Sequence, residues 1–135
     1  MTLSGVVYRN DYTGIMKENR KKIIITGATG FIGKVLVAVL RNHYKIVALS
    51  RNIEKAKKVF YDNIEIVYWD GTSSEQIIKY LDKSFGVINL AGENIGNRRW
   101  TKKQKEYIIN SRTGIGNALS SAIQKTKNKP EVFIQ

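Results

Sequence analysis

The chain has 135 residues, 42% of them hydrophobic, and a net charge of +12, which fits one globular domain with a real core rather than a disordered chain. It has no cysteine and one histidine, His43, which excludes disulfides, thiolate chemistry and a histidine-built zinc site, so no metal is expected. No apolar run approaches the roughly 18 residues of a membrane span, and no secretory signal is recognisable, so we expect a cytoplasmic protein.

Short apolar strands alternate with amphipathic helices from Lys21 onward, whereas residues 1–20 show weak periodicity and are interpreted as an N-terminal arm. The domain is therefore expected to span 21–135. The predicted strands are Lys22–Thr26, Lys45–Leu49, Ile64–Tyr68, Gly86–Leu90 and Glu131–Ile134. The predicted helices are Phe31–Asn42, Ile53–Phe60, the segment that begins at Ser73, and Thr101 to about Thr126.

This alternation predicts an α/β fold in which a parallel sheet is covered by helices on both faces. Right-handed crossovers favour the Rossmann-type doubly wound strand order 3-2-1-4-5. Capping boxes are predicted where Ser73 precedes Gln76 and where Thr101 precedes Gln104. Within the long helix, the glycines of "TGIGN" at 113–117 cost about 1 kcal/mol each relative to alanine, so that helix is expected to be weakened or bent.

Three glycines, Gly27, Gly30 and Gly33, directly follow the first strand and open the first helix in "TGATGFIG". In this context they predict a dinucleotide site in which Gly27 makes a tight turn, Gly30 lets the backbone approach a pyrophosphate, and Gly33 allows close packing. The start of the helix offers unpaired N–H groups to the phosphates. The predicted cofactor-binding residues of this segment also include Thr29, Phe31 and Ile32. The alternative is that the glycines only shape a turn.

The end of the second strand reads "ALSRN", with Ser50 and Arg51 in place of an acidic residue. An acid at this point usually accepts from the ribose 2′-hydroxyl of NAD, whereas the planar fork of an arginine suits a 2′-phosphate. We therefore predict NADP(H) in preference to NAD(H), bound through Ser50 and Arg51. The alternative for Arg51 is an ordinary surface arginine.

The ends of the third and fourth strands supply further candidates, because ligands bind at the carboxyl edge of an open α/β sheet. Asp70, in "YWDG", is placed to accept from an adenine amino group, with a turn or helix-entry role as the alternative. The "VINLAG" segment is predicted to pass along the cofactor. Its candidate cofactor-binding residues are Asn89, Leu90, Ala91 and Gly92.

With "TGATGFIG", "SRN", "WDG" and "VINLAG" in this order, the chain resembles the short-chain dehydrogenase/reductase superfamily of the extended or atypical type. The segment that follows is similar to the NAD(P)-dependent epimerase/dehydratase family, in particular its sugar-nucleotide epimerase-like "epimerase family" proteins. The residues that match its pattern are Asn89–Gly92, Arg99, Trp100, Thr101, Ser111 and Arg112. The resemblance covers roughly Lys21 to Gln135 and implies binding of a dinucleotide and of a small-molecule substrate that remains unknown.

The chemistry of the superfamily uses a tyrosine with a lysine four positions later, and none of the seven tyrosines fits that spacing. Position +4 after Tyr107, for example, is Ser111. The family also continues past the fifth strand into a serine-bearing segment and a C-terminal substrate region, whereas this chain ends at "EVFIQ". We therefore assign no catalytic residue and expect the dinucleotide-binding portion only.

Two residues after the fourth strand, Arg99 and Trp100, are interpreted as a substrate-contact loop in which arginine grips a phosphate or carboxylate. The alternative is a helix-entry loop with Trp100 as a packing anchor. A sheet that stops at the fifth strand would leave an unpaired edge and exposed apolar surface, which favours self-association.

Three classes of function are compatible with these patterns. The first is the NADP(H)-binding portion of an epimerase/dehydratase-like oxidoreductase, and the second is a non-enzymatic dinucleotide sensor with the same fold. The third is a basic nucleic-acid-binding module. The positive charge is spread over 20–22, 55–58, 102–105 and 125–129, mostly as lysine on polar helix faces, so the charge favours a solvated surface over the third class.

Overall fold

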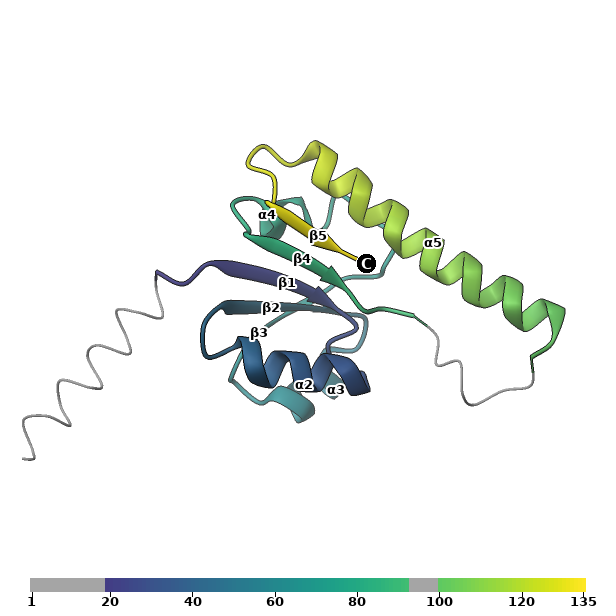
Figure 1. Cartoon of the computed structure of the whole chain (residues 1–135), viewed down its shortest axis with the longest axis horizontal. Helices are drawn as coiled ribbons and strands as arrows, with labels where there is room; N and C mark the ends of the chain where they lie inside the picture. The colour runs from purple at the N-terminus through teal and green to yellow at the C-terminus, as the bar shows by residue number, and fades with distance from the viewer. Residues whose placement is uncertain (1–18, 93–99) are drawn as a thin grey trace, which may run out of the picture.

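A computed structural model describes residues 19–92 and 100–135. Nearly all of the predicted arm and the predicted substrate residue Arg99 lie outside the described residues. Five parallel strands form one sheet in the order β3-β2-β1-β4-β5, which confirms the predicted topology (Figure 1). The strands are β1 (Lys22–Thr26), β2 (Lys45–Ser50), β3 (Glu65–Tyr68), β4 (Gly86–Asn89) and β5 (Val132–Ile134). The helices are α2 (Phe31–Leu40), α3 (Ile53–Phe60), α4 (Ile78–Leu81) and α5 (Lys102–Lys125).

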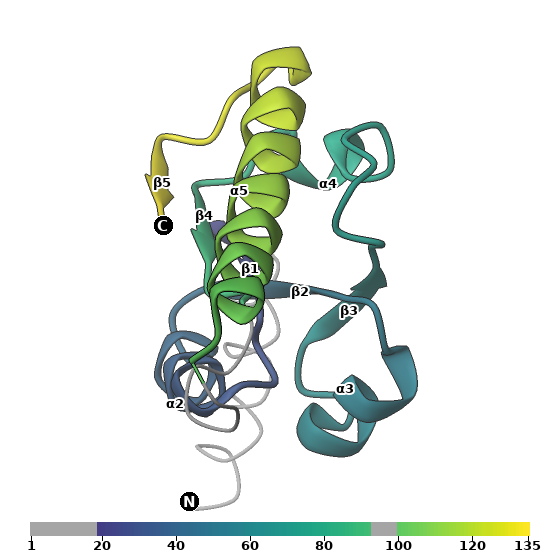
Figure 2. The same ribbon diagram turned by 90° about the vertical axis from the view of Figure 1, so that its right-hand side faces the viewer.

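Hydrophobic clusters cover both faces of the sheet because successive side chains of a strand point to opposite faces. Ile24 of β1 pairs in register with Val47 and Val87, and these three side chains pack with α4 and α5. Their neighbours Ile23 and Ile25 pack instead with α2 and α3. The central strands are therefore buried on both faces, which is why they read as continuous apolar runs in the sequence. Figure 2 looks at the sheet from its carboxyl edge, with α2 and α3 apart from α5.

The long helix α5 begins where the sequence predicts, because the Thr101 hydroxyl accepts a hydrogen bond from the backbone N–H of Gln104 at 3.1 Å. It runs unbroken to Lys125. The two glycines do not end the helix, and the weakening or bending expected from them stays a prediction. Packing stabilises the helix past the glycines, since it buries Leu119 and Ala122 against the sheet, and Gly116 itself is buried. Figure 1 shows that the first half of α5 extends beyond the carboxyl ends of the strands.

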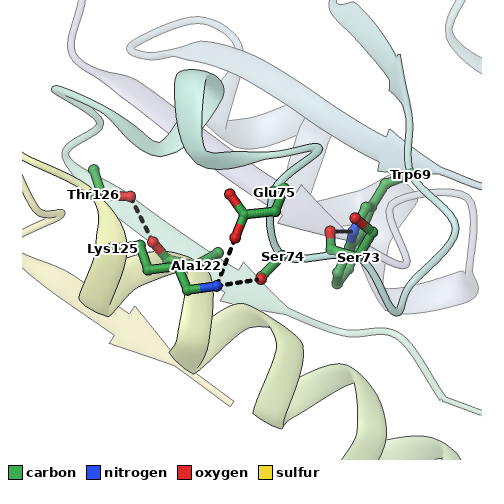
Figure 3. Close-up of polar contacts among 7 residues, drawn as sticks. All are labelled: Trp69, Ser73, Ser74, Glu75, Ala122, Lys125 and Thr126. Carbon is green, nitrogen blue, oxygen red and sulfur yellow. Dashed lines mark hydrogen bonds and ion pairs between the residues drawn. The ribbon is translucent and has the colours of Figure 1, made fainter.

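The predicted helix start at Ser73 is wrong, because α4 is a single turn that begins at Ile78. The carboxylate of Asp70 accepts the backbone N–H groups of Thr72 and Ser73, both at 2.8 Å, and the Ser73 carbonyl accepts from the Trp69 indole at 2.8 Å. These bonds hold the segment in a turn, so Ser73 cannot cap a helix. In Figure 3 the same segment is joined to α5 by Lys125, whose amine lies 2.6 Å from Glu75.

Several large apolar side chains remain exposed, and α2 and β5 carry most of them. On α2 the exposed fraction is 86% for Phe31, and Ile32, Val35 and Val39 are also exposed. On β5, which forms one edge of the sheet, all three residues are exposed. Within the described residues, no helix combines the length and the apolar character needed to cross a membrane.

Candidate dinucleotide-binding cleft

A cleft of about 490 Å³ opens at the carboxyl edge of the sheet. It lies where the chain leaves β1, β2, β3 and β4 and where the first half of α5 passes over that edge (Figure 1). Its lining residues are Thr26, Gly27, Ala28, Thr29, Gly30, Ala48, Leu49, Ser50, Arg51, Asn52, Lys55, Ala56, Trp69, Gly71, Leu90, Ala91, Gly92, Tyr107, Ser111 and Ile115. This is the position at which ligands bind in open α/β sheets.

Two of the three glycines in the first turn are required by close backbone contacts. Gly27 has a φ of +68°, and a Cβ there would lie 2.5 Å from the Leu90 carbonyl. A Cβ on Gly33 would lie 2.5 Å from the carbonyl oxygens of Gly27 and Ala28, so the helix packs against the turn itself. Real Cβ atoms do not approach backbone this closely, so both positions require glycine. The turn is therefore compact and touches the segment that follows β4.

The third glycine, Gly30, is the N-cap of α2 and offers no side chain to the first turn. The first bond of the helix is donated by Lys34 to the Gly30 carbonyl at 3.0 Å, so the N–H groups just before Lys34 have no partner within the helix. No acidic residue stands in the first turn. The side chains of Phe31 and Ile32 are exposed and outside the cleft lining, so their predicted contact with a cofactor would have to come from their backbone. The turn offers free N–H donors and a positive dipole end to an anion.

The segment after β4 is fixed by a buried hydrogen bond between β1 and β4. The Thr26 hydroxyl donates to the side-chain oxygen of Asn89, which also lies 3.3 Å from the Ala91 N–H. The side chain of Asn89 is thus turned toward β1, and Asn89 does not line the cleft. The next three residues, Leu90, Ala91 and Gly92, do line it. Asn89 therefore helps to hold the lining residues Leu90–Gly92 in position, and its own side chain does not face the cleft.

Two cationic side chains stand at the end of β2. Arg51 is exposed and lines the cleft beside Ser50. The Asn52 side chain caps α3 by accepting the Lys55 N–H at 2.9 Å, and this cap places Lys55 in the first turn of the helix, where it also lines the cleft. Sequence reasoning missed Lys55, although its spacing of four residues from Arg51 and the preceding asparagine were visible signals.

The predicted adenine acceptor Asp70 is occupied within its own turn. Hydrogen bonds from the backbone N–H groups of Ser73 and Thr72 hold the pKa of Asp70 below its usual value, so its carboxylate is charged at neutral pH. Its neighbours Trp69 and Gly71 line the cleft, whereas Asp70 does not. The structure thus supports the turn role that was the alternative for Asp70, and the adenine contact remains a prediction.

One face of α5 forms the remaining wall. Tyr107, Ser111 and Ile115 are spaced four residues apart and all line the cleft, as expected for one face of a helix. The Ser111 hydroxyl donates to the Ile108 carbonyl at 3.0 Å. Sequence reasoning missed Tyr107 as a wall residue, because nothing local indicates which face of α5 overhangs the sheet. The predicted substrate residue Trp100 is 63% exposed and does not line the cleft.

The sequence matches the NAD dependent epimerase/dehydratase family over residues 23–135, nearly all of the chain. The chain belongs to the NAD-dependent epimerase/dehydratase family. It is 39% identical over 116 residues to the epimerase family protein YfhF of Bacillus subtilis and 38% identical over 114 residues to the epimerase family protein SSP1921 of Staphylococcus saprophyticus. Each match covers 84% of this chain but 36% of the relative, so this epimerase/dehydratase-family chain spans about a third of the length of those relatives.

Solved structures agree with the fold of this family member. The oxidoreductase ylbE from Lactococcus lactis superposes with a TM-score of 0.60 and 26% identity, covering 83% of this chain and 46% of that one. Uronate dehydrogenase from Agrobacterium tumefaciens gives the same TM-score at 18% identity, with coverage of 84% and 40%. At the lower identity, the likeness shows the fold alone. Over residues 19–92 and 100–135, no group of three or more potential metal ligands is found.

Proposed function

We propose that this chain is the NADP(H)-binding portion of an epimerase/dehydratase-like oxidoreductase that acts in the cytoplasm on a small-molecule substrate. The observation that carries the NADP(H) preference is the charge of the cleft at the end of β2. Arg51 and Lys55 line it there, and among the described residues of the lining none is aspartate or glutamate. Two cations suit a 2′-phosphate, whereas a ribose 2′-hydroxyl calls for an acceptor.

The bound dinucleotide would lie across the carboxyl edge of the sheet. Its pyrophosphate would meet the free N–H groups at Gly30–Gly33, and its adenosine would extend toward Arg51 and Trp69. The other nucleotide would then pass Leu90–Gly92. The sequence contains no Tyr-x-x-x-Lys motif, which supports a second candidate, a non-enzymatic dinucleotide sensor. Under either proposal the chain alone binds the cofactor without a complete set of acid–base residues.

The Arg51→Ala variant tests the cofactor preference. Because a hydrogen bond to a charged group contributes about 1.5–3 kcal/mol, we expect the Kd for NADPH to rise roughly 10- to 100-fold and the Kd for NADH to change less than about threefold. Calorimetric titration of the wild type and Arg51→Ala with NADPH and with NADH measures these Kd values. Arg41→Ala, which removes the same charge outside the cleft, is the matched control.

Equal losses for NADPH and NADH in Arg51→Ala would contradict recognition of the 2′-phosphate by Arg51. A wild-type chain that binds NADH as tightly as NADPH would overturn the preference itself. Lys55→Gln is expected to shift the two cofactors in the same direction as Arg51→Ala but less, because a lysine makes a single point contact with a phosphate.

We further propose that the chain self-associates through its exposed apolar side chains on α2 and β5. Four large apolar residues of α2 are exposed, and β5 presents backbone groups at an open sheet edge. Sedimentation velocity should therefore show a mass that increases with protein concentration. In Val39→Lys, which places a charge among the exposed apolar side chains of α2, the increase in mass should be smaller. A monomer at every concentration tested would contradict this proposal.

A further inference from the structure

The glycine turn alone neutralises little of a dinucleotide's charge. A helix N-terminus is equivalent to roughly half a positive charge, whereas the pyrophosphate carries two negative charges at neutral pH. The turn from Thr26 to Gly33 contains no charged side chain, and the nearby Lys34 does not line the cleft. A full positive charge close to the turn would therefore add substantially to binding in a site partly shielded from water.

A chain of close contacts leads from this turn to an arginine of α5. The backbone of Gly27 touches the Leu90 carbonyl and the Ala91 nitrogen, at 2.5 and 2.6 Å from where its Cβ would lie. Gly92 follows directly and lines the cleft. Over Gly92 lies the side chain of Arg112, with its Nε 3.1 Å, its Cγ 3.6 Å and its Cζ 3.8 Å from the position of a Cβ. The missing Cβ of Gly92 thus leaves room for the guanidinium.

The position of Arg112 on α5 agrees with this contact. Its neighbour Ser111 and the residue one turn earlier, Tyr107, line the cleft, and this half of the helix overhangs the carboxyl edge of the sheet (Figure 1). Arg112 is exposed and is not itself a lining residue, but its contact with Gly92 places its side chain beside the cleft, where the chain leaves β4. Its helix α5 packs on the opposite face of the sheet from α2, and β1 lies between β4, which Gly92 follows, and β2, which Arg51 follows.

We propose that Arg112 binds the pyrophosphate of the dinucleotide from the α5 side. Its full positive charge would add to the partial positive charge at the N-terminus of α2. The planar guanidinium can present two N–H groups to phosphate oxygens while its stem rests on Gly92. This inference rests on the proposed cofactor function. Each arginine then binds a different group of the ligand: Arg51 binds the 2′-phosphate, and Arg112 binds the pyrophosphate.

The test uses Arg112→Gln and three probes: NADPH, NADH and adenosine 2′-monophosphate, which carries the 2′-phosphate but no pyrophosphate. We expect the Kd values for NADPH and NADH to rise by the same factor, roughly tenfold, and the Kd for adenosine 2′-monophosphate to stay within about twofold. Arg112→Lys keeps the charge without the planar fork and should show a smaller rise. Arg41→Gln controls for the general positive charge of the chain.

Unchanged NADPH affinity in Arg112→Gln would overturn the inference, and so would an equal loss for all three probes, which would make Arg112 a structural residue. If Arg112→Gln fails to fold, Arg112→Lys carries the same comparison. Arg51→Ala should give the reverse pattern, with losses for NADPH and adenosine 2′-monophosphate but not for NADH. A wild-type chain that binds none of the probes would overturn the proposed function and this inference together.

Discussion

Gly33→Ala is expected to destabilise the domain by at least about 3 kcal/mol, a large share of the stability of a typical domain. The added Cβ would lie 2.5 Å from the carbonyl oxygens of Gly27 and Ala28. Both oxygens are backbone atoms of the turn between β1 and α2, so no side-chain rotation relieves the overlap. Either α2 moves away from the sheet or the turn opens.

Gly114→Ala is the matched control, since it makes the same chemical change in another helix. A Cβ at Gly114 would meet nothing within 4 Å, so this variant should gain up to about 1 kcal/mol from the better helix propensity of alanine. Urea denaturation of the wild type and both variants, followed through the buried Trp69, measures the two effects. A stability of Gly33→Ala within about 1 kcal/mol of the wild type would contradict the close packing of the turn.

The parallel sheet was predictable because its central strands are buried on both faces and therefore appear as apolar runs, such as the one that ends at Thr26. The strand order then followed from the right-handed crossover rule. The start of α4 was not predictable from capping patterns. Ser73 and Gln76 have the right spacing, but the Ser73 N–H, which a capping box would give to Gln76, donates to Asp70 instead. The Gln76 side chain lies 3.4 Å from the Asp70 N–H. The hydrogen bonds of the Asp70 turn therefore override the capping pattern of Ser73 and Gln76.

Some residues of the candidate site were predictable from the sequence and others were not. Gly27 and Arg51 were identifiable because they directly follow strands, and strand ends share one edge of the sheet. Tyr107 was not assigned to the cleft, because its position depends on how far α5 extends past the sheet, which no neighbouring residue indicates. The structure also shows that the side chain of Arg112 lies against Gly92.

Thr29→Glu is expected to weaken NADPH binding by about 100-fold or more, the largest effect on the cofactor that a single substitution in this chain should have. Thr29 lines the cleft immediately before the N-cap Gly30, so a carboxylate there would face the pyrophosphate. Like charges brought together in a binding site cost several kcal/mol. The fold should not suffer, because a negative charge near a helix N-terminus is favourable by about 0.3–1 kcal/mol.

Thr29→Gln is the matched partner, with the size and shape of glutamate but no charge. We would titrate NADPH into both variants at equal ionic strength and compare their Kd values, after confirming by thermal unfolding that both are folded. A Thr29→Glu variant that is at least as stable as Thr29→Gln but binds NADPH at least about tenfold more weakly would establish that the turn before α2 receives the pyrophosphate. Equal affinities in the two folded variants would contradict that placement.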